Sequence, residues 1–205
     1  MKLIKDKTDA KNVPDARERI IKAVLVLIGE KGDINPTVRE IAQKANVNLA
    51  SINYYFRSKK KLLTEVEKYF TEEINQITSL LNDENIKKVE RILMWANEMM
   101  TQLAEYPGII WMLASKVINR NSIDKSMKKF INIKHSPLKK LVIEITGNKD
   151  DKLASLKAIQ IFSGIINPLI MQYGVGKGFG IDFRDKKIRK RHLDTFIKSI
   201  LNGHD

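Results

Sequence analysis

Hydrophobic and polar positions predict a short helix at the start of the segment 37–56. Val38, Ile41, Ala42 and Ala45 recur at the spacing of one helix face, and the residues between them are polar or charged. A helix with this pattern turns one apolar face inward and leaves the other face in water. We therefore expect a small helical core to begin here.

Residues at the helix ends support the same boundaries. Thr37 and Glu40 have the spacing of a capping box, in which a hydroxyl and a carboxylate satisfy free backbone donors at a helix start. Asn46 tolerates the left-handed conformation that ends a helix. A second short helix should begin at Asn48. Two short helices joined by a tight turn form a helix-turn-helix.

The second helix is expected to bury Ile52 together with Tyr55 or Phe56. Its exposed face should be polar and short enough to approach base edges in a DNA major groove. The positions that we expect to read bases on this helix are Asn48, Leu49, Ala50, Ser51, Asn53 and Tyr54.

Longer amphipathic segments flank this motif. Asp15 and Glu18 have capping-box spacing before an apolar stripe that should end at Gly32. Ser58 is a favourable N-cap for a long amphipathic helix over 58–81. This helix would link the helix-turn-helix to the rest of the chain.

Downstream, the apolar spacing stays helical, and no strand-like alternation is long enough to predict a sheet. We expect Pro137 to bend one helix and Pro168 to kink or restart another. The fold class is therefore predicted to be all-α. The expected downstream helices cover 85–106, 109–118, 123–145, 153–173 and 183–201.

The charge of the chain indicates a polyanionic partner. The net charge is +13 and the isoelectric point is about 9.8. No acidic residue occurs from Ile41 to Thr64, a stretch that carries Lys44, Arg57 and three consecutive lysines, Lys59–Lys61. Nucleic acid is the first expectation and an anionic membrane surface the second. A solvated basic rim on a small helical core is the alternative explanation.

Other features exclude several classes of function. The chain has no cysteine, which excludes disulfides and thiolate chemistry and fits a reducing cytosol. His135, His192 and His204 lack the spacing of a helical metal pair, and no catalytic-triad signature is present. No signal peptide or run of about 18 apolar residues is found. We expect a cytoplasmic protein without metal, cofactor, enzymatic activity or membrane insertion.

The string VNLASINYYFRSKKKLL, which follows TVREIAQKA, resembles the DNA-binding signature of the tetracycline-repressor-like (TetR-like) transcriptional regulators. The resemblance covers about residues 16–70. Ser51, Tyr55, Phe56 and Lys59 match the family pattern. Asn53 stands where the family often has Tyr, and Asn46 where it often has Gly.

The resemblance implies a helix-turn-helix domain and specific DNA contacts. Arg39 would reach a guanine, and Thr37, Tyr55 and Lys59 would contact phosphates. Lys60 joins this group because two lysines at a helix start oppose the helix dipole unless a phosphate lies there. The expected division is a flexible basic arm over 1–13, a DNA-binding domain over 14–60 with its motif at 37–56, and an effector and dimerisation domain over 58–205.

A cluster of tryptophan and methionine residues follows in two successive helices. Such residues form a hydrophobic core, or they line an apolar ligand pocket that repacks around varied shapes. The resemblance favours a pocket for a small apolar or amphipathic effector. Its candidate lining residues are Trp95, Met99, Met100, Trp111 and Met112.

The last two helices carry the largest apolar surfaces of the C-terminal half, and paired helices in the family form a dimer interface. Ile165, Leu169, Phe196 and Ile200 are the expected interface residues. The predicted function is a homodimeric regulator of a palindromic operator on double-stranded DNA, most simply a repressor released by its effector. The alternative is a binding protein of the same fold that uses its basic face on another polyanion or a protein partner.

Overall fold

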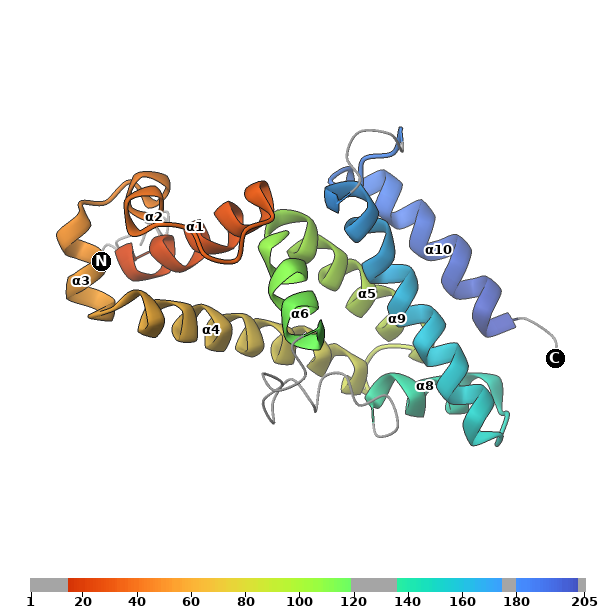
Figure 1. Cartoon of the computed structure of the whole chain (residues 1–205). Helices are drawn as coiled ribbons and strands as arrows, with labels where there is room; N and C mark the ends of the chain where they lie inside the picture. Colours follow the sequence, from red (N-terminus) through yellow and green to blue (C-terminus); the bar gives the residue numbers. More distant parts are fainter. Residues whose placement is uncertain (1–14, 119–135, 175–179, 203–205) are drawn as a thin grey trace, which may run out of the picture.

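A computed structural model describes residues 15–118, 136–174 and 180–202, and every regular element in these ranges is a helix, which confirms the all-α prediction. Figure 1 shows α1, α2 and α3 at one end of the molecule, α9 and α10 at the other, and α4 running from α3 toward the C-terminal helices. The elements are α1 Ala16–Lys31, α2 Val38–Ala45, α3 Leu49–Phe56, α4 Lys59–Ser79, the short 3-10 helix η1 Leu80–Asn82, α5 Lys88–Glu105, α6 Gly108–Ile118, α8 Pro137–Thr146, α9 Asp151–Gly174 and α10 Lys186–Asn202.

Side-chain caps fix the ends of the N-terminal helices, largely as predicted. Thr37 and Glu40 form the capping box of α2, and Asn46 ends that helix in the left-handed conformation, with φ of 53°. Asn48 caps α3 and Ser58 caps α4 through bonds to backbone N–H groups. Such caps satisfy donors that the first helical turn leaves free.

The start of α1 differs from its prediction. Asp15 occupies the N-cap position but makes no side-chain cap bond, so the expected capping box with Glu18 is wrong. Glu18 instead pairs with Lys22 at 2.8 Å and accepts a long hydrogen bond from the Tyr69 hydroxyl. These contacts hold the carboxylate on the α4 side of α1. The end of α1 at Gly32 is confirmed, with φ of 67°.

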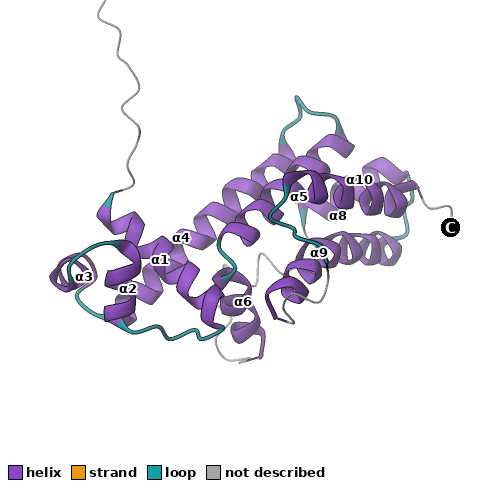
Figure 2. Ribbon diagram, turned by 90° about the horizontal axis from the view of Figure 1, so that it is seen from above, coloured by secondary structure: helices purple, strands orange, loops and turns teal. Residues whose placement is uncertain are grey.

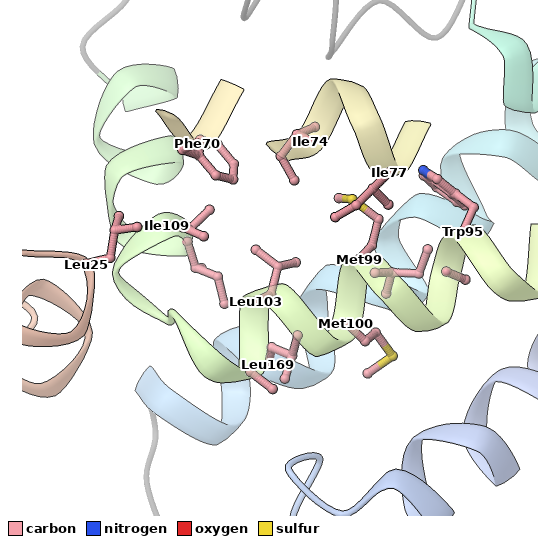
Figure 3. Packing of buried hydrophobic residues seen from close by; sticks show 14 of the residues in the cluster. Leu25, Phe70, Ile74, Ile77, Trp95, Met99, Met100, Leu103, Ile109 and Leu169 are labelled. Carbon is pink, nitrogen blue, oxygen red and sulfur yellow. The ribbon is translucent and has the colours of Figure 1, made fainter. Parts of the chain in front are cut away.

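Helix α4 connects the two ends of the molecule through one continuous hydrophobic cluster. Its buried face carries Val66, Phe70, Ile74 and Ile77. Figure 3 shows Phe70, Ile74 and Ile77 facing the core side chains of α5 and α6. The regular α-helix ends at Ser79, slightly earlier than predicted, and η1 continues the chain.

Proline positions correct two predicted helices. Pro137 begins α8, with Ser136 as its N-cap, and so does not bend a helix interior. Pro168 lies inside a single uninterrupted α9, so the helix does not restart there. Phe183 precedes α10 and is buried, so the last helix is shorter than predicted.

Helices α1 and α6 approach each other with no room for side chains at their closest point. A Cβ atom on Gly108 would lie 2.0 Å from the carbonyl oxygen of Leu25. A Cβ atom on Gly29 would lie 2.3 Å from Cγ of Pro107. Only glycine fits either position without moving backbone. The start of α6 is therefore seated directly on α1.

Helix α9 has the length and composition of a membrane-crossing helix, with a mean hydropathy of 1.4 over its most apolar window, of which 33% is buried inside the chain. Core helices of soluble proteins share these properties, and α9 packs against α5, α8 and α10. The expected arm over 1–13, His135, His204, residues 123–135 of a predicted helix and the segment 175–179 lie outside the described residues.

Candidate nucleic-acid interface

Helix α3 lies at the end of the molecule opposite α9 and α10 (Figure 1). It buries Ile52 and Phe56, which are 2% and 3% exposed, in the core shared with α1 and α2. Tyr55 is 37% exposed, so Phe56 is the aromatic partner of Ile52 in the core. The rest of the helix surface is open to solvent.

The predicted base-reading positions gather on α2 and α3. Arg39 is exposed on α2, and Tyr54 and Leu49 on α3 are exposed by 73% and 45%. Asn48, Ala50 and Asn53 are also exposed, whereas Ser51 is half-buried. Base contact by these residues remains a prediction.

Two of these residues also stabilise the helix start. The Asn48 side-chain oxygen accepts hydrogen bonds from the Ser51 N–H at 2.7 Å and from its hydroxyl at 2.9 Å. The carbonyl oxygen of the Asn48 amide is thereby engaged, so base recognition by Asn48 would rely on its NH2 group. This dual role was not evident from the sequence.

Thr37, a predicted phosphate contact, is engaged within its own capping box. Its backbone N–H and its hydroxyl both donate to Glu40 at 2.8 Å. The ion pair with Lys31 and these two bonds from Thr37 lower the pKa of Glu40 from 4.5 to about 2. A phosphate would have to replace Glu40 as the acceptor of the Thr37 hydroxyl, so we expect Thr37 to act first as a cap.

The other predicted phosphate contacts lie along the same surface. The hydroxyl-bearing ring of Tyr55 packs edge-on against Tyr54, with 5.2 Å between ring centroids. The Lys59 ammonium donates to the backbone carbonyl of Asn35 at 3.1 Å and so ties the loop before α2 to the start of α4. Lys60 is exposed. An ammonium has three donors, so Lys59 can hold Asn35 and still face an anion.

Cations on this surface differ in their partners. Lys44 pairs with Glu30 at 2.6 Å, which joins α2 to α1. Among the described residues, no ion pair involves Arg39, Lys60 or Lys61. Unpaired exposed cations beside an acid-free helix create a field that attracts phosphate.

Arg57 has a backbone conformation that was not predicted from the sequence. It ends α3 with φ of 63°, a conformation that L-residues adopt at a cost of about 1–2 kcal/mol. Its side chain is exposed, and no ion pair among the described residues involves it. A cation in a strained turn between the exposed α3 and α4 joins the candidate phosphate contacts. An arginine between two predicted helices was the only available signal.

The residues predicted to line an effector pocket divide between the core and its edge. Trp95, Met99 and Met100 are buried at 3% exposure or less, and Trp111 and Met112 are half-buried. Figure 3 shows Trp95 and Met99 on the side of α5 that faces α4, whereas Met100 points away from α4. The five residues therefore do not share one face, and their role in ligand binding remains a prediction.

The two tryptophans nevertheless have unusual hydrogen-bonding states. The indole N–H groups of Trp95 and Trp111 are both buried, and neither has an acceptor in the part of the chain that the structure describes. A buried donor without a partner costs about 1–3 kcal/mol, and native proteins contain few of them.

The predicted dimer residues also divide. Ile165 and Leu169 are fully buried against the chain's own core, so their assignment to a subunit interface is wrong. Phe196 and Ile200 are half-buried on α10. Ile165 and Leu169 lie on the inward face of α9, which packs against α5, α8 and α10. The exposed apolar residues of α9 are Leu156 at 57%, Ile159 at 46% and Met171 at 43%.

The described residues contain no cluster of three or more histidine and acidic side chains that could hold a metal ion. His192 instead has a structural environment. Its Nε2 atom lies 2.8 Å from the carbonyl oxygen of Gly164, and its ring stacks on Phe196 with 4.7 Å between centroids. The contact with Gly164 joins α10 to α9, whereas the stacking lies within α10.

Comparison with known proteins points to one kind of protein for the N-terminal part. Residues 20–66 match the family described as bacterial regulatory proteins, tetR family. The chain is 49% identical over 47 residues to the HTH-type transcriptional dual regulator CecR of Shigella flexneri, covering 23% of this chain and 21% of that one. It is 28% identical over 101 residues to the HTH-type transcriptional regulator BetI of Brucella abortus, covering 48% and 51%. The matches thus span about a fifth to a half of these relatives' length.

Solved structures extend the similarity of fold to nearly the whole chain. The fatty acid degradation regulator FadR of Bacillus halodurans has a TM-score of 0.59 at 19% identity, covering 94% of this chain and 98% of that one. A TetR-family transcriptional regulator of Haemophilus influenzae, HI0893, has a TM-score of 0.50 at 18% identity, covering 88% and 95%. Similarity at this level of identity demonstrates a shared fold.

Proposed function

We propose that this chain, whose residues 20–66 match the tetR family of bacterial regulatory proteins, is a homodimeric transcriptional repressor that binds a palindromic operator and leaves it when a small effector binds. The exposed face of α3 carries this proposal. Polar and planar side chains lie on that face, and it is flanked by exposed cations that form no ion pair with any described residue. A protruding helix of this kind fits a major groove.

We divide the DNA contacts into two roles. Arg39 and the exposed residues of α3 read bases, because they lie on the two helices of the motif and reach outward. Tyr55, Arg57, Lys59 and Lys60 hold phosphates at the junction of α3 and α4. The N-terminal N–H groups of α4 would support the same phosphate through the helix dipole.

A binding-site selection experiment tests the function. Random duplex DNA is selected on the full-length protein, and the enriched sequence is labelled and competed with unlabelled duplexes. We expect a palindromic sequence, and competition by this sequence at least about a thousandfold better than by a scrambled duplex of the same composition. Equal competition by both duplexes, or by heparin at equal charge, would support the alternative of a general polyanion binder.

The dimer interface is proposed on the outer face of α9 and α10. These helices pack side by side at the end of the molecule away from α3 (Figure 1 and Figure 2). Leu156, Ile159 and Met171 of α9 are exposed, and Phe196 and Ile200 of α10 are half-buried. Burial of this apolar row in a two-fold contact would hold two copies of α3 at a fixed separation, about 34–36 Å for adjacent half-sites.

An effector is proposed to bind beside α5 and α6. The unpaired indole donors of Trp95 and Trp111 support this site, because a ligand with hydrogen-bond acceptors would satisfy them. Ligand in this region would contact α4, whose Phe70, Ile74 and Ile77 pack on the same core (Figure 3). A shift of α4 would change the separation of the two recognition helices, so effector and DNA would lower each other's affinity.

A further inference from the structure

A groove of about 640 Å³ lies between α5 and α10, apart from the DNA-binding surface and from the tryptophan residues of the effector site. Its apolar wall is formed by Leu93, Met94 and Leu193. Its cationic residues are Lys186, Arg189 and Lys190, all within the first turns of α10. The volume falls within the range of roughly 300–1,000 Å³ that is usual for small-molecule sites.

Arg189 is the unusual member of this groove because it is buried and forms no ion pair with a carboxylate in residues 15–118, 136–174 and 180–202. Its side chain is 3% exposed. One terminal nitrogen donates to the carbonyls of Phe183 at 2.7 Å and Arg184 at 2.9 Å, and the other donates to the Thr101 hydroxyl at 3.1 Å. All three acceptors are neutral, and the buried Nε–H group has no acceptor among the described residues.

The guanidinium of Arg189 therefore has only neutral hydrogen-bond acceptors in the part of the chain that the structure describes. No ion pair there joins its guanidinium to an acidic side chain. Buried charges in proteins are normally paired, because removing an ion from water without compensation is costly. An anion in the groove would supply the missing pair.

The start of α10 adds to the same positive field. The first turn contains Lys186 and Lys187 as well as Arg189, and no acidic residue. Lysines at a helix N-terminus oppose the helix dipole, which already favours a negative charge there. Asp185, directly before the helix, accepts a hydrogen bond from the N–H of Lys187 at 2.7 Å and offsets part of this charge.

The groove also contains two carboxylates, those of Glu98 on α5 and Asp194 on α10. Because the groove also contains Lys186, Arg189 and Lys190, its side chains carry a small excess of positive charge. A phosphate dianion or a polyanion would meet repulsion from both carboxylates, whereas one carboxylate group matches the excess. The apolar wall then favours a ligand with a hydrocarbon body.

We propose that the α5–α10 groove is a binding site for a small monocarboxylic acid. The carboxylate is held by Arg189 together with Lys186 and Lys190, and the hydrocarbon part lies along Leu93, Met94 and Leu193. The site is separate from the effector site that we assign to α5 and α6. It does not depend on DNA binding, so it stands or falls independently of the proposed function.

Titration calorimetry of the full-length protein with sodium octanoate tests the ligand class. Octanamide, which has the same chain without the charge, is the matched ligand. We expect one saturable octanoate site per chain and at least about tenfold weaker octanamide binding, as the loss of a charge-assisted hydrogen bond predicts. Equal affinity for the two ligands, or no saturable binding of octanoate, would overturn the proposal.

Two pairs of variants locate the site. Met94→Glu puts a negative charge on the apolar wall, and Ile34→Glu is its control because the two side chains are 44% and 43% exposed. Lys190→Gln removes a cation of the groove, and Lys198→Gln removes an exposed cation of the same helix that does not line it. All four positions are exposed, so the fold should survive each change.

We expect Met94→Glu to weaken octanoate binding at least about tenfold and Lys190→Gln to weaken it about threefold to tenfold, with both controls unchanged. If Met94→Glu and Lys190→Gln bind octanoate as the unchanged protein does, the ligand occupies another site, such as the effector site, and the groove assignment is wrong. Circular dichroism of each variant confirms that the helices are intact.

Discussion

The α1–α3 end, which we propose binds DNA, and the α9–α10 end of this molecule are both helical, but their structures are determined in different ways. At the DNA-binding end, Thr37, Asn48 and Ser58 each cap the helix that follows them. At the other end, α9 carries two isoleucines in different environments. Ile159 is 46% exposed, and Ile165 is fully buried. Local hydrogen bonds decide the first case, and neighbouring helices decide the second.

This difference teaches which functional surfaces can be located from residues near one another in sequence. A recognition helix is defined by its own caps and by the few residues it buries, so its outward face follows from its period. A dimer face consists of whatever apolar surface the rest of the fold leaves uncovered. It can be located only when the packing partners of the helix are known.

The largest expected effect contrasts two isoleucines of α9. Ile165→Glu should lower the free energy of unfolding by about 4 kcal/mol or more, because it places a charge in the core. Ile159→Glu should leave the fold intact but produce monomers that no longer bind the operator tightly. Chemical denaturation and light scattering measure the two effects. If the Ile159→Glu protein remained a dimer, this face of α9 would not be part of the dimer interface.

At the DNA-binding end, the largest expected effect belongs to Arg39. Arg39→Ala should cost about 1–3 kcal/mol of operator binding and relax the preference at one base pair. Arg39 is exposed and makes no ion pair among the described residues, so the fold should be unaffected. Binding measured on a panel of single-base operator variants tests this. A uniform loss across the panel would instead make Arg39 a phosphate contact.

The capping box of α2 offers a smaller, local effect. Thr37→Ala should lower the free energy of unfolding by about 1 kcal/mol, whereas Thr37→Ser should retain most of the stabilisation by the cap. The pKa of Glu40 is lowered from 4.5 to about 2, so its contribution to stability is complete above pH 4.5 and is lost as the pH falls through 2. The difference in stability between the unchanged protein and Glu40→Gln should shrink over that pH range. A difference that is independent of pH would mean that the Glu40 charge does not stabilise α2.

The smallest expected effects concern the lysines at the start of α4. Replacing Lys59 or Lys60 with Gln should lower the slope of log affinity against log salt by about one unit each. Lys59→Gln should also loosen the loop that contains Asn35, because its ammonium holds the carbonyl of that residue. Hydrogen exchange of the loop separates the two roles. An unchanged salt slope would exclude the lysine concerned from the interface.

The sequence predicted the fold class, the helix-turn-helix and most of its caps, because these depend on contacts within a few residues. It did not predict that the hydroxyl of Thr37 and the amide oxygen of Asn48 are already engaged by their own helices. It also assigned Ile165 and Leu169 to a subunit interface, because an apolar helix shows no preference between its core face and its partner face. The positive φ of Arg57 and the burial of Arg189 were not predicted from the sequence.

The seating of α6 on α1 bears on how this protein can be engineered. Chimaeric regulators are built by exchanging a DNA-binding domain at a boundary chosen from sequence, here near residue 60. In this chain a Cβ atom at position 29 would collide with Pro107 and the backbone nitrogen of Gly108, and one at position 108 would collide with the backbone of α1. An exchanged α1 with alanine at position 29 would therefore push α6 away and tilt the exchanged DNA-binding domain. A functional graft needs glycine at both positions, even though one of them lies well outside the exchanged segment.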